Sequence, residues 1–134
     1  MKLLSLFVSL YLFSNTAIAQ KEEYVFQLDV YKNHPMMYVA TMKTFACSNY
    51  GIFIRQGWSR DTLTMNIIGI DSRQKCNNIV DVAKEWVPIN GVRSGQFHLR
   101  FLWERKVNYF LVEFDGDSFS VTPERGDFIM HTSN

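Results

Sequence analysis

Gln96–Thr122 has the sequence QFHLRFLWERKVNYFLVEFDGDSFSVT, which contains three successive strand signals. Every second residue at its start is large and apolar, namely Phe97, Leu99, Phe101 and Trp103. This period of two is typical of a strand with one buried and one solvated face. The next run, Val107–Phe114, is almost wholly apolar, as expected of a central strand covered on both sides. Asp115–Gly116 is a strong hairpin signal, so the stretch predicts a three-stranded meander.

The chain before and after this meander shows similar patterns. Further strands are expected over residues 24–30, 36–45, 50–55 and 62–70, and a last short one over residues 128–130. Residues 56–61 are expected to form the loop of a hairpin. Seven or eight short strands at regular spacing predict an all-β chain, folded as a single-domain antiparallel β-sandwich over residues 20–134. A small β-barrel is the alternative.

Residues 79–87 give a mixed signal. Their apolar positions follow helical spacing and are Ile79, Val82, Ala83, Trp86 and Val87. Pro88 would end a helix there. We therefore expect one short helix in this segment, and an irregular strand is the alternative.

Val92–Phe97 (VRSGQF) resembles the corner turn that leads into the penultimate strand of many immunoglobulin-like sandwiches. In those domains an aromatic residue two positions after a glycine plugs the corner, and Phe97 stands where tyrosine is usual. The resemblance implies an immunoglobulin-like sandwich and no particular function.

The first 19 residues have the features of a secretory signal peptide. Lys2 supplies a positive charge, Leu3–Phe13 is apolar, and Ala17–Ala19 is a small-residue cleavage site. The apolar run is shorter than the roughly 20 residues of a membrane span. We expect cleavage before Gln20 and export to the periplasm or the extracellular medium, with no membrane span afterwards.

Charge argues against nucleic acid as a partner. Removal of residues 1–19 takes away one lysine, which leaves 13 basic residues against 13 acidic ones. The basic residues are scattered among acidic ones, whereas a nucleic-acid-binding domain usually has a basic excess or stripe.

Two cysteines, Cys47 and Cys76, are present in the chain. An exported protein with two cysteines most often pairs them, so we expect a structural disulfide. No C-x-x-C motif is present, which argues against a redox or metal-binding pair.

Motifs for chemistry are sparse. The sequence lacks the common nucleophile-elbow, zinc-protease, P-loop and dinucleotide-binding patterns, and its three histidines have no metal-ligand spacing. We expect no cofactor, no metal and no enzyme activity. The expected function is a non-enzymatic binding or interaction module of the bacterial cell envelope, with a protein or glycan partner. The alternatives are a small-ligand carrier with a barrel cavity and, less favoured, a hydrolase.

The most suggestive segment is Arg55–Arg60 (RQGWSR). Arg55, Trp58 and Arg60 form the candidate binding site, because tryptophan with flanking arginines is typical of recognition surfaces and loops on a rigid sheet often carry binding residues. Gly57 is expected to let the backbone turn tightly. The alternative is that Trp58 folds back to cap one end of the core.

Overall fold

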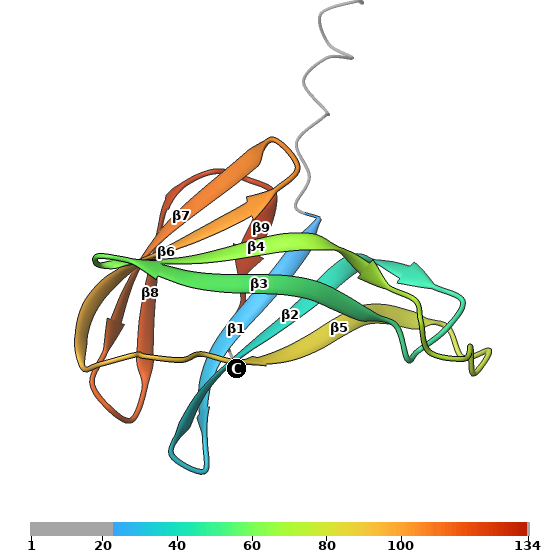
Figure 1. Cartoon of the computed structure of the whole chain (residues 1–134), viewed down its shortest axis with the longest axis horizontal. Helices are drawn as coiled ribbons and strands as arrows, with labels where there is room; N and C mark the ends of the chain where they lie inside the picture. Colours follow the sequence, from blue (N-terminus) through green and yellow to red (C-terminus); the bar gives the residue numbers. More distant parts are fainter. Residues whose placement is uncertain (1–22, 134) are drawn as a thin grey trace, which may run out of the picture.

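A computed structural model of the chain describes residues 23–133, and the expected signal peptide and its cleavage site lie outside this range (Figure 1). The described residues form nine strands and no helix. The strands are β1 (Tyr24–Tyr31), β2 (His34–Phe45), β3 (Gly51–Ser59), β4 (Thr62–Asp71), β5 (Asp81–Pro88), β6 (Gly95–Trp103), β7 (Lys106–Phe114), β8 (Phe119–Arg125) and β9 (Ile129–His131). Thus no helix within residues 23–133 is long and apolar enough to cross a membrane.

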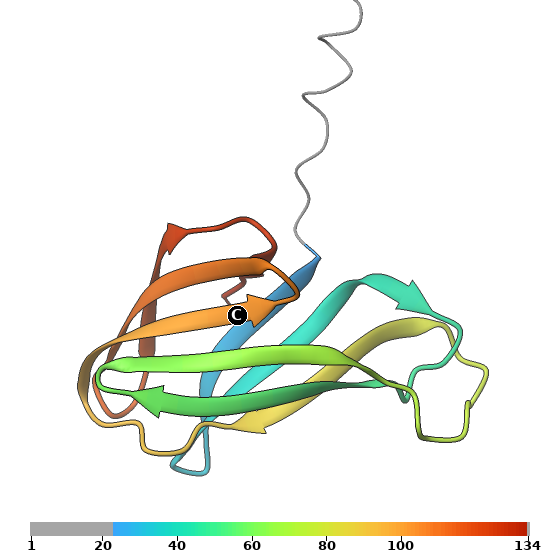
Figure 2. The same ribbon diagram turned by 45° about the horizontal axis from the view of Figure 1, so that its top comes forward.

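The strands form two packed sheets, which confirms the expected β-sandwich. The smaller sheet has the order β5-β2-β1-β9 and the larger sheet the order β3-β4-β6-β7-β8. Figures 1 and 2 show the β3–β4 hairpin lying across β1, β2 and β5. Neither sheet closes on itself, so the alternative of a small barrel is wrong.

The helix expected over residues 79–87 is also wrong, because the segment forms β5. Ala83 and Val87 are four residues apart, a spacing that fits one face of a helix and also one face of a strand. In the structure both are buried, while β5 pairs antiparallel with β2. Pairing with a neighbouring strand therefore overrides the local helical pattern. The strand that was the alternative for this segment is therefore the one observed, over Asp81–Pro88.

Most strand pairs are antiparallel, as expected, but two are parallel. These are β1 with β9 and β4 with β6. The parallel β4–β6 pair lies inside the larger sheet, whereas immunoglobulin sheets are antiparallel. Val92–Phe97 leads into β6, which is the sixth of the nine strands in residues 23–133. The immunoglobulin-like corner is therefore not found at this place in the fold.

Aromatic side chains fill the core between the sheets. Phe26 of β1 is fully buried, and its ring centroid lies 4.6 Å from that of Phe101 and 4.9 Å from that of Phe110. Asn108 of β7 is a buried polar residue beside this core. Its Oδ1 accepts a hydrogen bond of 3.1 Å from the backbone N–H of Phe128. That bond holds the segment before β9 against the core. It also satisfies the buried backbone N–H of Phe128, which would destabilise the fold if it had no partner.

The expected disulfide between Cys47 and Cys76 is confirmed. Their Cα atoms lie 5.2 Å apart, within the range that a disulfide can bridge. The bond joins the end of β2 to the long connection between β4 and β5. It lies at the opposite end of β3 from Trp58, so it does not form part of the candidate site.

Candidate functional site

The β3–β4 hairpin is longer and its turn tighter than the sequence predicts. Ser59 pairs directly with Thr62, so the turn contains only Arg60 and Asp61 instead of the whole of residues 56–61. Gly57 is a strand residue and does not make the turn. Arg60 makes it instead, with a left-handed φ of +57° that is uncommon for a residue with a side chain. The turn therefore fixes the direction in which the Arg60 side chain leaves the sheet.

Trp58 lies against the open end of the sandwich. Its Nε1 donates a hydrogen bond of 2.6 Å to the backbone carbonyl oxygen of Asn90, in the connection between β5 and β6. Its ring meets that of Phe97 with centroids 5.3 Å apart and planes at 62°, an edge-to-face contact. Phe97 is 5% exposed and Trp58 is 38% exposed. Trp58 thus covers the core with one side of its ring and leaves the rest to solvent, which combines the two alternatives that the sequence left open.

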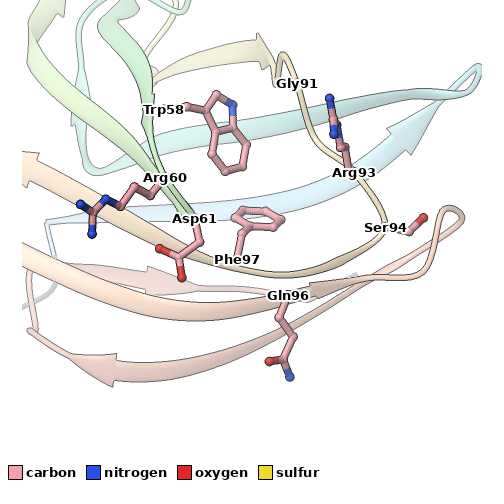
Figure 3. Close-up of a pocket in the computed structure, with 8 residues that line it drawn as sticks. All are labelled: Trp58, Arg60, Asp61, Gly91, Arg93, Ser94, Gln96 and Phe97. Atoms are coloured by element: carbon pink, nitrogen blue, oxygen red, sulfur yellow. The ribbon is translucent and has the colours of Figure 1, made fainter.

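A surface pocket of about 350 Å³ opens beside this aromatic pair. Its walls come from the β3–β4 turn, the β5–β6 connection and the start of β6, and they are Trp58, Arg60, Asp61, Gly91, Arg93, Ser94, Gln96 and Phe97. Figure 3 shows Arg60 and Arg93 on opposite sides of the Trp58–Phe97 pair. The pocket thus has an aromatic centre with one arginine on either side, and the Arg60 side chain extends outward from the rings.

The charges around the pocket are available to a ligand. Neither Arg60 nor Arg93 forms an ion pair with an acidic side chain of residues 23–133. Asp61 is largely exposed, and its nearest basic group is His98 Nε2 at 3.9 Å. Guanidinium groups bind carboxylates through two parallel hydrogen bonds, and neither arginine is engaged in such a pair.

Arg55 does not belong to this pocket. It lies three residues before Trp58 in β3, and an odd separation along a strand places two side chains on opposite faces. Its strand partner is Asn66, on the solvent face of the larger sheet. The structure therefore brings together two of the three candidate residues, Trp58 and Arg60, and separates the third.

The parallel β4–β6 pairing brings the remaining pocket residues to Trp58. Thr62 at the start of β4 is the register partner of His98, and the His98 N–H donates a 2.8 Å hydrogen bond to the Asp61 carbonyl oxygen. This contact sets the start of β6, with Phe97, beside the β3–β4 turn. Arg93 lies in the connection just before β6, so the same contact brings it to the pocket. Sequence reasoning missed Arg93, because no local pattern indicates a parallel contact across more than 30 residues.

His98 lies between two carboxylates on the solvent face of the larger sheet. Its Nδ1 is 3.0 Å from Glu124 Oε1, and its Nε2 faces Asp61 at the longer distance given above. It belongs to the polar face of the alternating run Gln96–Trp103, and its side chain is partly exposed. Within residues 23–133 no group of three or more His, Cys, Asp and Glu side chains is arranged to hold a metal ion.

Comparisons with models of protein families, with curated proteins and with solved structures found no match for this chain. Function is therefore inferred from the geometry of the pocket.

Proposed function

We propose that the protein is an exported, non-enzymatic binding module of the cell envelope whose pocket takes one acidic sugar unit, a uronate. The observation that carries this proposal is the pair of arginines, Arg60 and Arg93, on either side of a partly exposed tryptophan. A uronate combines a carboxylate with a ring that has an apolar C–H face. Those are the two chemical features that the pocket matches.

Each part of the ligand has a counterpart among the lining residues. A carboxylate suits the planar guanidinium of Arg60 or Arg93, which offers two parallel donors. The exposed part of the Trp58 ring is a rigid surface for the C–H face of a sugar, since its Nε1 is held by Asn90. The hydroxyl of Ser94, another lining residue, supplies a hydrogen-bonding group for a sugar hydroxyl.

The size and charge of the region favour a single acidic unit over a long polyanion. The pocket volume of about 350 Å³ is at the small end of known ligand sites. The mature chain has equal numbers of acidic and basic residues, so no general attraction for a polyanion is expected. Recognition of the ligand then depends on Arg60 and Arg93 and not on the net charge of the protein.

The proposed export rests on two features. The ordered signal segment of residues 1–19 supports it, and a disulfide in a small domain is compatible with an oxidising compartment. Intact-mass measurement of the protein recovered outside the cytoplasm tests it directly. A mass that begins at Gln20 supports export with cleavage, and a mass that includes residues 1–19 contradicts it.

Calorimetric titration tests the binding proposal, with trigalacturonate as the acidic probe and galactotriose as its neutral counterpart. Arg60→Gln and Arg93→Gln should each weaken trigalacturonate binding at least about fivefold, the loss of one charge-assisted contact. Arg55→Gln is the matched control, because it removes the same charge from β3 on the face that points away from the pocket. It should change the affinity by less than about twofold, as expected for a distant exposed charge.

Two results would contradict the proposal. In the first, galactotriose binds as tightly as trigalacturonate, so that the carboxylate is not recognised. In the second, Arg55→Gln weakens binding as much as Arg93→Gln does, so that only general charge matters. Absence of binding by both probes also rules out a uronate as the ligand of this pocket.

A further inference from the structure

A second pocket, of about 270 Å³, lies on the solvent face of the smaller sheet. It is lined by Asp29 and Tyr31 of β1, Met36 of β2 and Trp86 of β5. Tyr31 is 64% exposed and Trp86 is 54% exposed, which are high values for aromatic side chains of a folded domain. Packing in the core does not explain why two aromatic side chains are exposed beside a carboxylate.

Strand register brings these four side chains together. Asp29 pairs with Met36, and Tyr31 follows two residues later on the same face of β1. On the other side of β2, Met36 pairs with Pro88, and Trp86 lies two residues before Pro88, opposite Tyr38. The side chains therefore surround Met36 from two neighbouring strands, so the pocket is built on regular sheet and not on loops.

Trp86 is held in place by its neighbour. Its ring centroid lies 4.9 Å from that of Tyr38, with the planes tilted by 46°. An aromatic pair directly across two strands is among the more stabilising cross-strand contacts. The indole is thus fixed before any ligand arrives, which lowers the entropy cost of binding.

The one charged group among the four lining residues of this pocket is the carboxylate of Asp29. Asp29 forms no ion pair with any basic side chain of residues 23–133, and its Oδ1 accepts a hydrogen bond only from the backbone N–H of Val30, at 2.8 Å. On the same face of the sheet, Lys84 donates to Asp81 at 2.8 Å, so its charge is already balanced. The carboxylate of Asp29 is therefore free to pair with a positively charged ligand.

The ring of Tyr31 already attracts a cation within the protein. Lys32 Nζ lies 5.4 Å from its centroid, inside the range of cation–π contacts. Lys32 is an exposed residue of the β1–β2 turn, and its long side chain can move aside. A ligand cation at that face of the ring therefore displaces the Lys32 ammonium.

We propose that this pocket binds an organic ammonium group, of the trimethylammonium type. Aromatic faces attract such a group through their quadrupole, and tryptophan does so most strongly. The carboxylate of Asp29 adds charge complementarity, and the polarizable sulfur of Met36 adapts to the methyl groups. This site differs in sheet, charge and ligand from the arginine pocket, and the inference does not depend on the proposed function.

Calorimetric titration of the full mature chain with choline tests this inference. The neutral isostere 3,3-dimethylbutan-1-ol has the same shape without the charge and is the matched probe. Choline should bind at least about fivefold more tightly than the isostere, the gain expected of cation–π and carboxylate contacts. Asp29→Asn and Trp86→Ala should each weaken choline binding about fivefold or more, and Arg60→Gln in the other pocket should leave it unchanged.

Thermal melts establish that both variants are folded, which matters most for Trp86→Ala because it also loses the contact with Tyr38. Both Asp29 and Trp86 are exposed, and Asp29→Asn keeps the shape of the side chain. Equal binding of choline and its isostere would overturn the inference and indicate an apolar or sugar-stacking surface. An unchanged choline affinity in both Asp29→Asn and Trp86→Ala, or no choline binding at all, would overturn it as well.

Discussion

The indole of Trp58 is hydrogen-bonded to the backbone of Asn90, which joins the larger sheet to the connection that leaves the smaller one. Gln56, on the same face of β3, adds two contacts: its Nε2 donates to the Pro88 carbonyl oxygen at 2.7 Å, and its Oε1 accepts from the Asn90 N–H at 3.2 Å. A Cβ at Gly91 would lie 3.3 Å from Trp58 Nε1, so the small residue allows this approach. Two side chains of β3 thus close this end of the sandwich.

Two substitutions of Trp58 distinguish the stability that its hydrogen bond contributes from the stability that its packing contributes. Trp58→Phe keeps an aromatic ring against Phe97 and should cost about 1 kcal/mol, the usual value of one hydrogen bond. Trp58→Ala loses both and should cost roughly 2–3 kcal/mol, less than a fully buried aromatic residue because part of the ring is exposed. Urea unfolding curves give both values. A loss below about 0.5 kcal/mol for Trp58→Ala would contradict the role of this side chain in closing the sandwich.

Removal of the disulfide should destabilise the fold without affecting the pocket. Cys47 and Cys76 are 29 residues apart. In the chain-entropy model, a crosslink that closes a loop of that length lowers the entropy of the unfolded chain and so stabilises the fold by about 3.5 kcal/mol. The Cys47→Ser/Cys76→Ser double variant should therefore lose roughly 2–4 kcal/mol of unfolding free energy. Its affinity for trigalacturonate should equal that of the parent chain at a temperature where both are folded. A drop in affinity under those conditions would mean that the bridge positions the binding residues.

Local sequence patterns predicted most of the fold. Period-two runs, such as Gln96–Trp103, and short apolar runs, such as Val107–Phe114, identified eight of the nine strands in residues 23–133, because both patterns follow from strand geometry and burial. For the β5 segment a helix was favoured and a strand was the alternative, since Ala83 and Val87 fit both equally well. The parallel β4–β6 pair could not be predicted, because it depends on contacts between segments that are distant in the sequence.

The candidate site was predicted only in part, for the same reason. Trp58 and Arg60 stood out because they lie in one short segment that is rich in arginine. Arg55 was included by sequence proximity, although strand alternation sends it to the opposite face. Arg93 and Phe97 reach the pocket through pairing of β6 with β4, which no local pattern reveals.

Two glycines should respond in opposite ways to the addition of a methyl group. Gly126 has a φ of +98°, and a Cβ there would overlap with the carbonyl oxygen of Val107. Gly126→Ala should cost roughly 2–4 kcal/mol, since both the backbone angle and the space oppose it. Gly57 has no neighbour within 4 Å of the added Cβ and no left-handed φ, so Gly57→Ala should change stability by less than about 1 kcal/mol.

Thermal melts of both glycine variants make this comparison. Because each substitution adds the same group, the difference between them reports the local environment. Equal losses for Gly57→Ala and Gly126→Ala would contradict the tight contact between Gly126 and β7.

Protonation of His131 should make the protein less stable in mild acid. Burial in β9, where its ring lies 5.2 Å from that of Phe26, lowers the pKa of His131 below its usual 6.5. The unfolded chain therefore binds a proton at a higher pH than the folded chain does, and unfolding free energy must fall as the pH drops through 6.5 towards the folded-state pKa. Asp71, Asp81 and Asp115 have pKa values lowered from 3.8, so their loss of stabilisation occurs in more acidic solution and does not overlap this window. Urea unfolding between about pH 7.5 and pH 5 should show this decline, and His131→Phe, which cannot take up a proton, should show a flatter profile. An equally steep decline in the variant would assign the effect to other groups.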